Sequence, residues 1–342
     1  MSYAQLIWHN GSIKPWHEAT VHVSAHALHY GSSVFEGERV YATPRGPCYF
    51  RLDDHTHRLF ESARLYDIEV GYSEEEINAA CRELIVANAM QSAYVRPIVF
   101  RGAGGLGVLP DEGAPVDVSI LALNWGAYHG DALKNGADVC VSSWSRPAPN
   151  TLPTWAKAGG NYLSSQLIGF EARRGGYAEG IALGYNGLLS EGAGENLFLV
   201  KKGKLLTPPT SAGVLAGITR DSVITLAGTL GIVVEERDLP REALYSADEV
   251  FMTGTAAEIT PIRSVDRKLV GDGKPGPITR LLQDAFFGLF DGRTVDRWRW
   301  LTPIAEEGLA ECAVREKCGH GWPLLDSRDQ GRTQEETREA AA

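Results

Sequence analysis

Hydrophobic residues in the first 124 positions recur mostly with the two-residue period of β-strands. Two short apolar runs flank Asn10-Gly11, a residue pair typical of tight hairpin turns. Residues 94–101 alternate between hydrophobic and polar, and residues 116–124 form a nearly continuous apolar run. Strands are therefore predicted at Leu6–Trp8, Ser12–Trp16, Ser33–Tyr41, Pro47–Leu52, Tyr94–Arg101 and Val116–Asn124.

Two helices are predicted between these strands. Asp53 or Asp54 can cap a helix that runs through Arg58 to Leu65. A second helix follows Ser73-Glu74-Glu75-Glu76, a capping box in which the serine side chain and the last glutamate satisfy the first backbone amides. Its apolar residues then share one helical face: Ile77, Ala80, Cys81, Leu84 and Ile85.

The hydrophobic period is lost over residues 125–136, which indicates a linker between two domains. The pattern then resumes with strands at Asp138–Ser142, Ile181–Tyr185, Leu188–Glu191, Asn196–Val200, Lys204–Thr207 and Val250–Thr253. Helices are predicted from just after Asn161 to about Arg174, from Ile218 to about Leu230, and from Pro277 onward. The sequence thus predicts domains at 1–124 and 137–302, with residues 303–342 as a charged, disordered tail.

Composition and charge exclude several classes of protein. The net charge of −10 and the pI near 5.4 argue against a nucleic-acid partner, which requires a basic face. No apolar run approaches the roughly 18 residues of a membrane-spanning helix, and the N-terminus does not resemble a signal peptide. Five scattered cysteines suit a reducing compartment. We expect a cytoplasmic protein.

Lys157 is the first candidate for chemistry, because it lies among small residues between an irregular segment and the start of a helix. A lysine removed from water has a lowered pKa and can act as a nucleophile toward a carbonyl group. The adjacent Gly159 and Gly160 would allow a ligand to approach the backbone closely. The alternative is an ordinary surface lysine with its stem packed on the protein.

Glu191 is the second candidate, at the end of a strand and next to glycine. A carboxylate there could hold the protonated nitrogen of a heterocyclic cofactor. The alternative is a residue in a hairpin turn. Phosphate could bind where Gly217-Ile218-Thr219 opens a helix and where Thr253–Ala256 follows a strand, with Arg58 adding charge. Small residues also open many helices simply as caps.

A carboxylate ligand could be recognised by four further residues through hydroxyl and guanidinium groups: Tyr30, Tyr94, Arg96 and Tyr128. Arg96 could equally be a strand residue that faces solvent. No metal site is predicted, because the histidines and the late Cys312, Cys318 and His320 lack metal-ligand spacing. The Gly102–Gly107 loop does not fit a dinucleotide fingerprint.

Four motifs, in order along the chain, resemble those of branched-chain amino-acid aminotransferases of the fold-type IV (class IV) pyridoxal-phosphate family. They are His26-Ala27-Leu28-His29-Tyr30-Gly31 with Phe35-Glu36-Gly37, Lys157-Ala158-Gly159-Gly160-Asn161-Tyr162, Ser190-Glu191-Gly192-Ala193-Gly194-Glu195-Asn196 and Phe251-Met252-Thr253-Gly254-Thr255-Ala256-Ala257-Glu258. The resemblance covers about residues 5–302. It implies an α/β fold of the α+β type, with a smaller N-terminal domain, a larger C-terminal domain and the cofactor between them.

The resemblance also implies a role for individual residues. Lys157 matches the lysine that binds pyridoxal 5′-phosphate covalently and moves the substrate proton, Glu191 the partner of the pyridine nitrogen, and Tyr162 the phenol near the cofactor oxygen. The phosphate site corresponds to Arg58, Ile218, Thr219 and Thr255. The substrate α-carboxylate site corresponds to Tyr94 and the backbone of Thr255 and Ala256. The side-chain pocket corresponds to Phe35, Trp125 and Tyr128, with Tyr30 and Val108 supplied by the partner subunit of a homodimer. Arg96 matches the residue that, with Tyr30 and Tyr128, receives the distal carboxylate of glutamate.

The reaction implied is transfer of the amino group of L-leucine, L-isoleucine or L-valine to 2-oxoglutarate in a ping-pong sequence. Other members of the same fold are D-amino-acid transaminases, (R)-amine transaminases and aminodeoxychorismate lyases, and Arg96 with Tyr30 and Tyr128 favours the branched-chain interpretation over these. A non-catalytic pyridoxal-phosphate-binding protein would not need Glu191. One departure from the family is Glu38, where an apolar residue is usual. Alternation along a strand predicts that Glu38 points away from Phe35 and Gly37.

Overall fold

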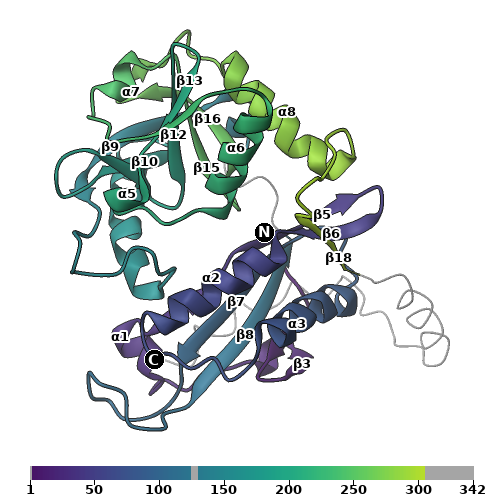
Figure 1. Cartoon of the computed structure of the whole chain (residues 1–342). Coiled ribbons are helices and arrows are strands. Elements are labelled where there is room, and N and C mark those ends of the chain that lie inside the picture. The colour runs from purple at the N-terminus through teal and green to yellow at the C-terminus, as the bar shows by residue number, and fades with distance from the viewer. Residues whose placement is uncertain (1, 125–129, 305–342) are drawn as a thin grey trace, which may run out of the picture. The chain divides into compact units, whose positions relative to one another are not determined.

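The structure is a computed structural model that describes residues 2–124 and 130–304. These residues belong to one structural unit, Met1–Ile304, built on two nine-stranded sheets (Figure 1). Trp125 and Tyr128 lie outside the described residues, and so does the predicted tail from Ala305 onward.

The first sheet combines the early strands with the last described one. Its strands are β1 (Ser2–Tyr3), β2 (Leu6–His9), β3 (Ser12–Pro15), β4 (Ser33–Phe35), β5 (Glu38–Thr43), β6 (Gly46–Phe50), β7 (Ala93–Arg101), β8 (Val116–Asn124) and β18 (Leu301–Pro303). Their order is β18-β6-β5-β7-β8-β2-β3, with β1 paired to β8 and β4 paired to β7. The predicted hairpin is confirmed, because β2 and β3 pair in antiparallel register around Asn10-Gly11.

Three helices accompany this sheet: α1 (His26–Tyr30), α2 (Leu52–Arg64) and α3 (Glu74–Ala87). Helix α3 packs on β7 and β8, and α2 packs on α3 and β4 (Figure 1), so that their apolar faces close a core that includes Leu59, Leu84 and Ile120. The capping box of α3 is confirmed, with hydrogen bonds in both directions between Ser73 and Glu76.

The predicted cap of α2 was wrong. Arg51 holds the N-cap position in a left-handed conformation (φ 56°), and Asp53 and Asp54 lie in the first turn. The Asp54 carboxylate accepts a hydrogen bond from the Arg51 side chain instead of capping the helix, and Asp53 accepts one from Asn78 of α3. Both acids still sit near the positive end of the helix dipole, where negative charge is favourable.

The second sheet contains β9 (Ala137–Ser145), β10 (Glu179–Leu183), β11 (Leu189–Gly192), β12 (Asn196–Lys201), β13 (Lys204–Thr207), β14 (Val234–Glu236), β15 (Glu249–Gly254), β16 (Glu258–Val265) and β17 (Lys268–Leu269). Their order is β11-β10-β9-β16-β15-β12-β13-β14, with β17 paired to β16. Strand β15 is buried on both faces, because Phe251 and Met252 point into separate apolar clusters.

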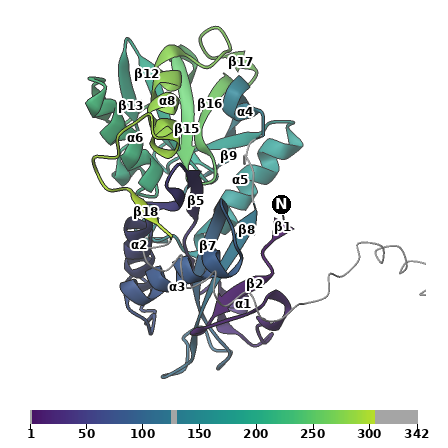
Figure 2. The same ribbon diagram turned by 90° about the vertical axis from the view of Figure 1, so that its right-hand side faces the viewer.

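The helices of this second part are α4 (Ala132–Asn135), α5 (Tyr162–Arg174), α6 (Ile218–Thr229), α7 (Ala243–Ser246) and α8 (Pro277–Asp291). Helices α6 and α8 pack on β15 and against each other (Figure 2), around an aromatic cluster that includes Phe198, Phe251 and Phe286. Helix α5 packs on β9 and β10. Short 3-10 turns lie at Trp16–Glu18, Gly159–Asn161 and Thr210–Ala212.

Strand β16 lies at the centre of the second sheet, yet the sequence did not predict it. Pro261 stands in its middle, and proline cannot donate a hydrogen bond to a neighbouring strand. The fold accommodates it because the parallel ladder with β9 begins only at Ile262, so Pro261 has a strand neighbour on one side alone.

Candidate active site

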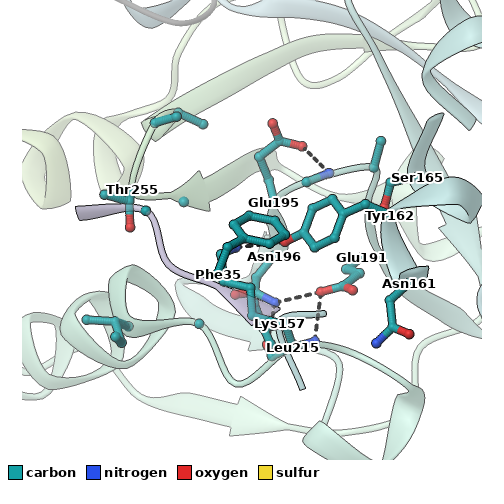
Figure 3. A pocket seen from close by; sticks show the side chains of 18 of the residues that line it. Phe35, Lys157, Asn161, Tyr162, Ser165, Glu191, Glu195, Asn196, Leu215 and Thr255 are labelled. Carbon is teal, nitrogen blue, oxygen red and sulfur yellow. Dashed lines mark hydrogen bonds between the residues drawn. The ribbon is translucent and has the colours of Figure 1, made fainter. Parts of the chain in front are cut away.

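A cavity of about 500 Å³ contains most of the candidate residues. Its walls come from both sheets and from the helices and loops between their strands, including Phe35 at the end of β4, Arg58 on α2, Lys157 before α5 and Glu191 on β11. Figure 3 shows Phe35, Lys157, Tyr162 and Glu191 lying close to one another around this space. The fold thus brings together residues more than 150 positions apart in the sequence.

Lys157 is fixed by its backbone and by the neighbouring Tyr162. Its N–H donates to Ser62 Oγ at 3.0 Å, and its carbonyl accepts from the N–H of Phe35 at 3.0 Å. The amine Nζ donates to Tyr162 Oη at 2.7 Å, and it lies 5.0 Å from the centre of the Phe35 ring. The surface-lysine interpretation is therefore wrong, since the amine is enclosed by two aromatic rings inside the cavity.

Glu191 is buried, and three donors hold its carboxylate. Arg146 Nη2 lies 2.8 Å from Oε1, while Asn196 Nδ2 and the backbone N–H of Leu215 each donate to Oε2 at 3.0 Å. Figure 3 draws the bonds from Asn196 and Leu215. Burial raises the pKa of Glu191, and the Arg146 guanidinium and the Leu215 amide oppose that rise by stabilising the carboxylate.

The beginning of α6 offers backbone amides to an anion. Its N-cap is Gly217, which has no side chain that could cap the helix, and the first amides of a helix have no partner within it. A Cβ on Gly217 would collide with Asn196 Oδ1, so only glycine lets the helix start this close to the Glu191 site. Ile218 and Thr219 line the cavity here, as predicted for a phosphate site.

Arg58 belongs to a buried network next to this helix start. Its Nε and Nη2 donate to the two oxygens of Glu36 at 2.6 and 2.8 Å, and Nη1 donates to the Ala216 carbonyl at 2.9 Å. His55 Nδ1 lies 2.7 Å from Glu36 Oε2. Burial alone would raise the pKa of Glu36, but Arg58 and His55 together bring that pKa below its ordinary range. Glu36 is therefore a carboxylate that aims Arg58 along the cavity wall.

The opposite part of the cavity combines an aromatic ring with a cation. Arg96 stacks over Phe35, with 4.5 Å from the guanidinium carbon to the ring centre, and its Nη2 donates to Tyr94 Oη at 2.7 Å. Arg96 Nε is buried and has no hydrogen-bond partner among the described residues. All three side chains line the cavity, so the interpretation of Arg96 as a solvent-facing residue was wrong.

Thr255 and Ala256 line the cavity from the turn between β15 and β16. Tyr30 and Val108 do not line it: both are exposed, and the Tyr30 hydroxyl donates to the Leu106 carbonyl at 2.7 Å. It stays a prediction that a partner subunit contributes Tyr30 and Val108 to this cavity.

Four residues of the site were not selected from the sequence: Glu36, His55, Arg146 and Asn196. Glu36 and Asn196 stand inside the motifs quoted above, but nothing in their spacing shows which group each one contacts. Arg146 is 45 positions from Glu191 and meets it only through the pairing of β9 with β10 and β10 with β11.

Among the described residues, no helix is long and apolar enough to cross a membrane.

Comparisons with known proteins agree with this geometry. The profile of the family "Amino-transferase class IV" matches residues 33–265. The branched-chain-amino-acid aminotransferase of Salmonella typhimurium is 58% identical over 302 residues, which cover 88% of this chain and 98% of that protein. The crystal structure of the Escherichia coli branched-chain amino acid aminotransferase has a TM-score of 0.88 and 57% identity, covering 88% of this chain and 100% of that one. The crystal structure of the Thermobaculum terrenum branched-chain amino acid aminotransferase in its PLP-form has a TM-score of 0.83 and 37% identity, covering 90% and 100%.

Proposed function

The chain belongs to the class IV aminotransferase family and is a branched-chain-amino-acid aminotransferase, and on this basis we propose how its residues bind cofactor and substrate. It transfers the amino group of branched-chain amino acids. The proposal adds 2-oxoglutarate as the acceptor, bound after the first product leaves, as in a ping-pong sequence. Its main support is a single cavity that holds a lysine amine, a buried carboxylate and an anion site.

Pyridoxal 5′-phosphate (PLP) is the proposed cofactor, and the residues present fit its three polar parts. The uncapped start of α6 with Arg58 suits the phosphate, Glu191 suits a protonated ring nitrogen, and Lys157 suits the aldehyde carbon. The Thermobaculum terrenum relative was solved in its PLP-form. When bound, the cofactor supplies an electron sink that stabilises negative charge at the substrate α-carbon.

Lys157 is the proposed catalytic residue. A free amine at Nζ can take the proton from the substrate α-carbon and return it one position further along. The contacts to Tyr162 and the Phe35 ring limit where Nζ can point. Holding the base in one direction contributes to the rate because proton transfer needs a defined geometry.

Glu191 is proposed to keep the cofactor nitrogen protonated. It can do so only as a carboxylate, and burial by itself favours the neutral acid. Arg146, Asn196 and the Leu215 amide stabilise the ionised form. A proton shared between the Glu191 carboxylate and a bound ring nitrogen would then stay on the nitrogen.

The substrate pocket is proposed to serve both an aliphatic and a charged side chain. Tyr94 and the backbone of Thr255 and Ala256 would bind the α-carboxylate, next to the Phe35 ring. Arg96 would reach only the distal carboxylate of the longer acceptor. Trp125 and Tyr128, with the partner subunit's Tyr30 and the partner subunit's Val108, are proposed to complete the wall. This assembly requires a homodimer, and a cytoplasmic location likewise stays a prediction.

The proposal is tested by replacing the lysine. Lys157→Ala should still take up pyridoxal phosphate, because the Arg58 and Glu191 contacts remain, but its turnover of L-leucine should fall by about 10³-fold or more. Tyr162→Phe is the matched control, since it removes only the hydroxyl that orients the amine and should cost far less. Steady-state kinetics measures the turnover of each variant, and equilibrium dialysis measures its binding of the cofactor. Normal turnover by Lys157→Ala would exclude Lys157 as the catalytic base.

A further inference from the structure

Glu258 has a backbone conformation that is unusual for its residue type. Its φ is 55°, in the left-handed region that a residue with a Cβ adopts rarely and usually only where its surroundings hold it. It pairs with Gly254 in the β15–β16 ladder, so the residues between them form a tight three-residue turn. That turn, residues 255–257, lines the cavity.

The Glu258 side chain ties this turn to the first sheet. Its Oε1 lies 3.2 Å from Arg39 Nη1 and accepts a hydrogen bond from Tyr41 Oη at 2.9 Å. Both partners are on β5, and the Glu258 side chain is only 8% exposed. Tyr41 is itself fixed, because its ring stacks on Phe290 of α8 with 3.6 Å between ring centres.

Arg39 also reaches the middle of the turn. The same Nη1 that contacts Glu258 donates to the Ala256 carbonyl at 3.3 Å. In the first sheet Arg39 is paired with Tyr94, whose hydroxyl is the other proposed ligand of the substrate α-carboxylate. Arg39 therefore sits between the two elements that must converge on that carboxylate.

The second sheet supplies a contact of its own to the turn. Thr260 Oγ1, on β16, donates to the Ala257 carbonyl at 2.7 Å. This contact stays within one strand and its turn, so it cannot set the distance between the turn and Tyr94. The contacts from Arg39 and Tyr41 cross between the sheets and can set it.

We propose that Glu258, acting through Arg39 and Tyr41, is a positioning residue that holds the 255–257 turn at the distance from Tyr94 at which both bind the substrate α-carboxylate. The inference rests on the proposed function, because it assumes that the turn binds this carboxylate. Glycine would adopt the same φ without strain but could not bind Arg39. Glutamate at this position is therefore explained by its side chain and not by its backbone.

The test measures binding of 4-methylvalerate, a leucine analogue without the amino group, to the cofactor-loaded enzyme. Glu258→Gly and Glu258→Gln should raise its Kd by roughly tenfold or more, as expected for the loss of a charge-assisted contact. Their KM for L-leucine should rise in parallel, while the visible spectrum of the bound cofactor stays unchanged. The neutral amide of the same acid lacks the carboxylate, so its Kd should be similarly high for the wild type and for all variants.

Glu249→Gln is the matched control, because Glu249 is a buried glutamate at the far end of β15 that caps α8 and does not line the cavity. It should keep the wild-type Kd. A wild-type Kd in Glu258→Gly would overturn the proposal, since the backbone conformation alone would then suffice. If the Glu258 variants fail to fold, Tyr41→Phe removes one of the same contacts and must raise the Kd in the same direction. Failure of the wild-type enzyme to bind 4-methylvalerate would instead refute the proposed substrate site.

Discussion

At the scale of single residues, Glu38 is the most unusual position in the first sheet. It is fully buried on β5 and does not line the cavity that Phe35 and Gly37 line, so the prediction that it points away from them is confirmed, although the predicted strand is broken between β4 and β5. Neither carboxylate oxygen accepts a hydrogen bond of ordinary geometry from a described residue, and the polar neighbour is the weakly donating thiol of Cys81. Burial, with a smaller contribution from Glu36, raises the pKa of Glu38 well above its ordinary value.

This burial predicts a pH-dependent cost to stability. A carboxyl whose pKa is higher in the folded than in the unfolded state contributes most below the unfolded pKa of about 4, and that contribution is lost as the pH rises toward the folded pKa. Glu38→Gln stays neutral at every pH. Its free energy of unfolding should therefore match that of the wild type near pH 4 and exceed it by roughly 1–3 kcal/mol near pH 7.

Urea unfolding of the two proteins at several pH values measures this difference. The control is Glu69→Gln, which removes a carboxylate from an exposed position and should show no such trend. A constant difference between Glu38→Gln and the wild type across the pH range would show that Glu38 does not change protonation state on folding.

At the scale of elements, the start of α6 links the phosphate site to the Glu191 site. Gly217→Ala places a methyl group against Asn196, which donates to Glu191. We expect it to lower the free energy of unfolding by about 1–3 kcal/mol through overpacking and to weaken cofactor binding. Gly228→Ala is the control in the same helix, because nothing lies within 4 Å of the added Cβ. It should leave cofactor binding unchanged and stabilise the protein by about 0.5 kcal/mol. Equal effects of the two substitutions would show that Gly217 has no special packing role.

Elements whose signals are local could be predicted from the sequence. The capping box at Ser73 and the β2–β3 hairpin depend on residues close together in the chain, and both are confirmed. The cap of α2 and strand β16 were not predicted correctly, because each depends on neighbours that are distant in sequence. Arg51 bonds to the main chain of α6 at Ile218, and Pro261 is tolerated only because of the register with β9.

The central residues of the site could be predicted from the sequence, but the residues around them could not. Lys157 and Glu191 stand out by their small neighbours and by family motifs, and the structure places both in the cavity. The residues that contact the Glu191 carboxylate and the Arg58 guanidinium come from other elements. Arg146 on Glu191, and Glu36 with His55 on Arg58, become neighbours only through the tertiary fold.

At the scale of the whole molecule, apolar side chains are exposed near the predicted partner-supplied residues. Leu28, Leu106 and Leu109 are exposed together with Tyr30 and Val108, and Tyr30 is bonded to the loop that carries Leu106. Such exposed apolar residues are typical of surfaces that a second subunit covers. A homodimer in which this segment reaches the other subunit's cavity would explain their exposure.

The predicted sharing of sites can be tested with mixed dimers. Lys157→Ala and Tyr30→Ala are each expected to be impaired as homodimers. If Tyr30 acts in the partner's cavity, random mixing of the two variants restores about a quarter of the sites to full composition, and activity with L-leucine rises above that of either parent. If each chain builds its own pocket, no mixed dimer contains an intact site and activity stays at the average of the parents.

The main proposal for this enzyme is that one cavity binds both a branched-chain amino acid and a dicarboxylic oxo acid. The most direct measurement is the visible absorption of the cofactor-loaded protein, first with L-leucine alone and then, after removal of leucine, with 2-oxoglutarate. We predict that the cofactor band is lost with leucine and returns with 2-oxoglutarate, because Phe35 and Arg96 face the same space. A band that does not respond to leucine would contradict the proposed substrate pocket.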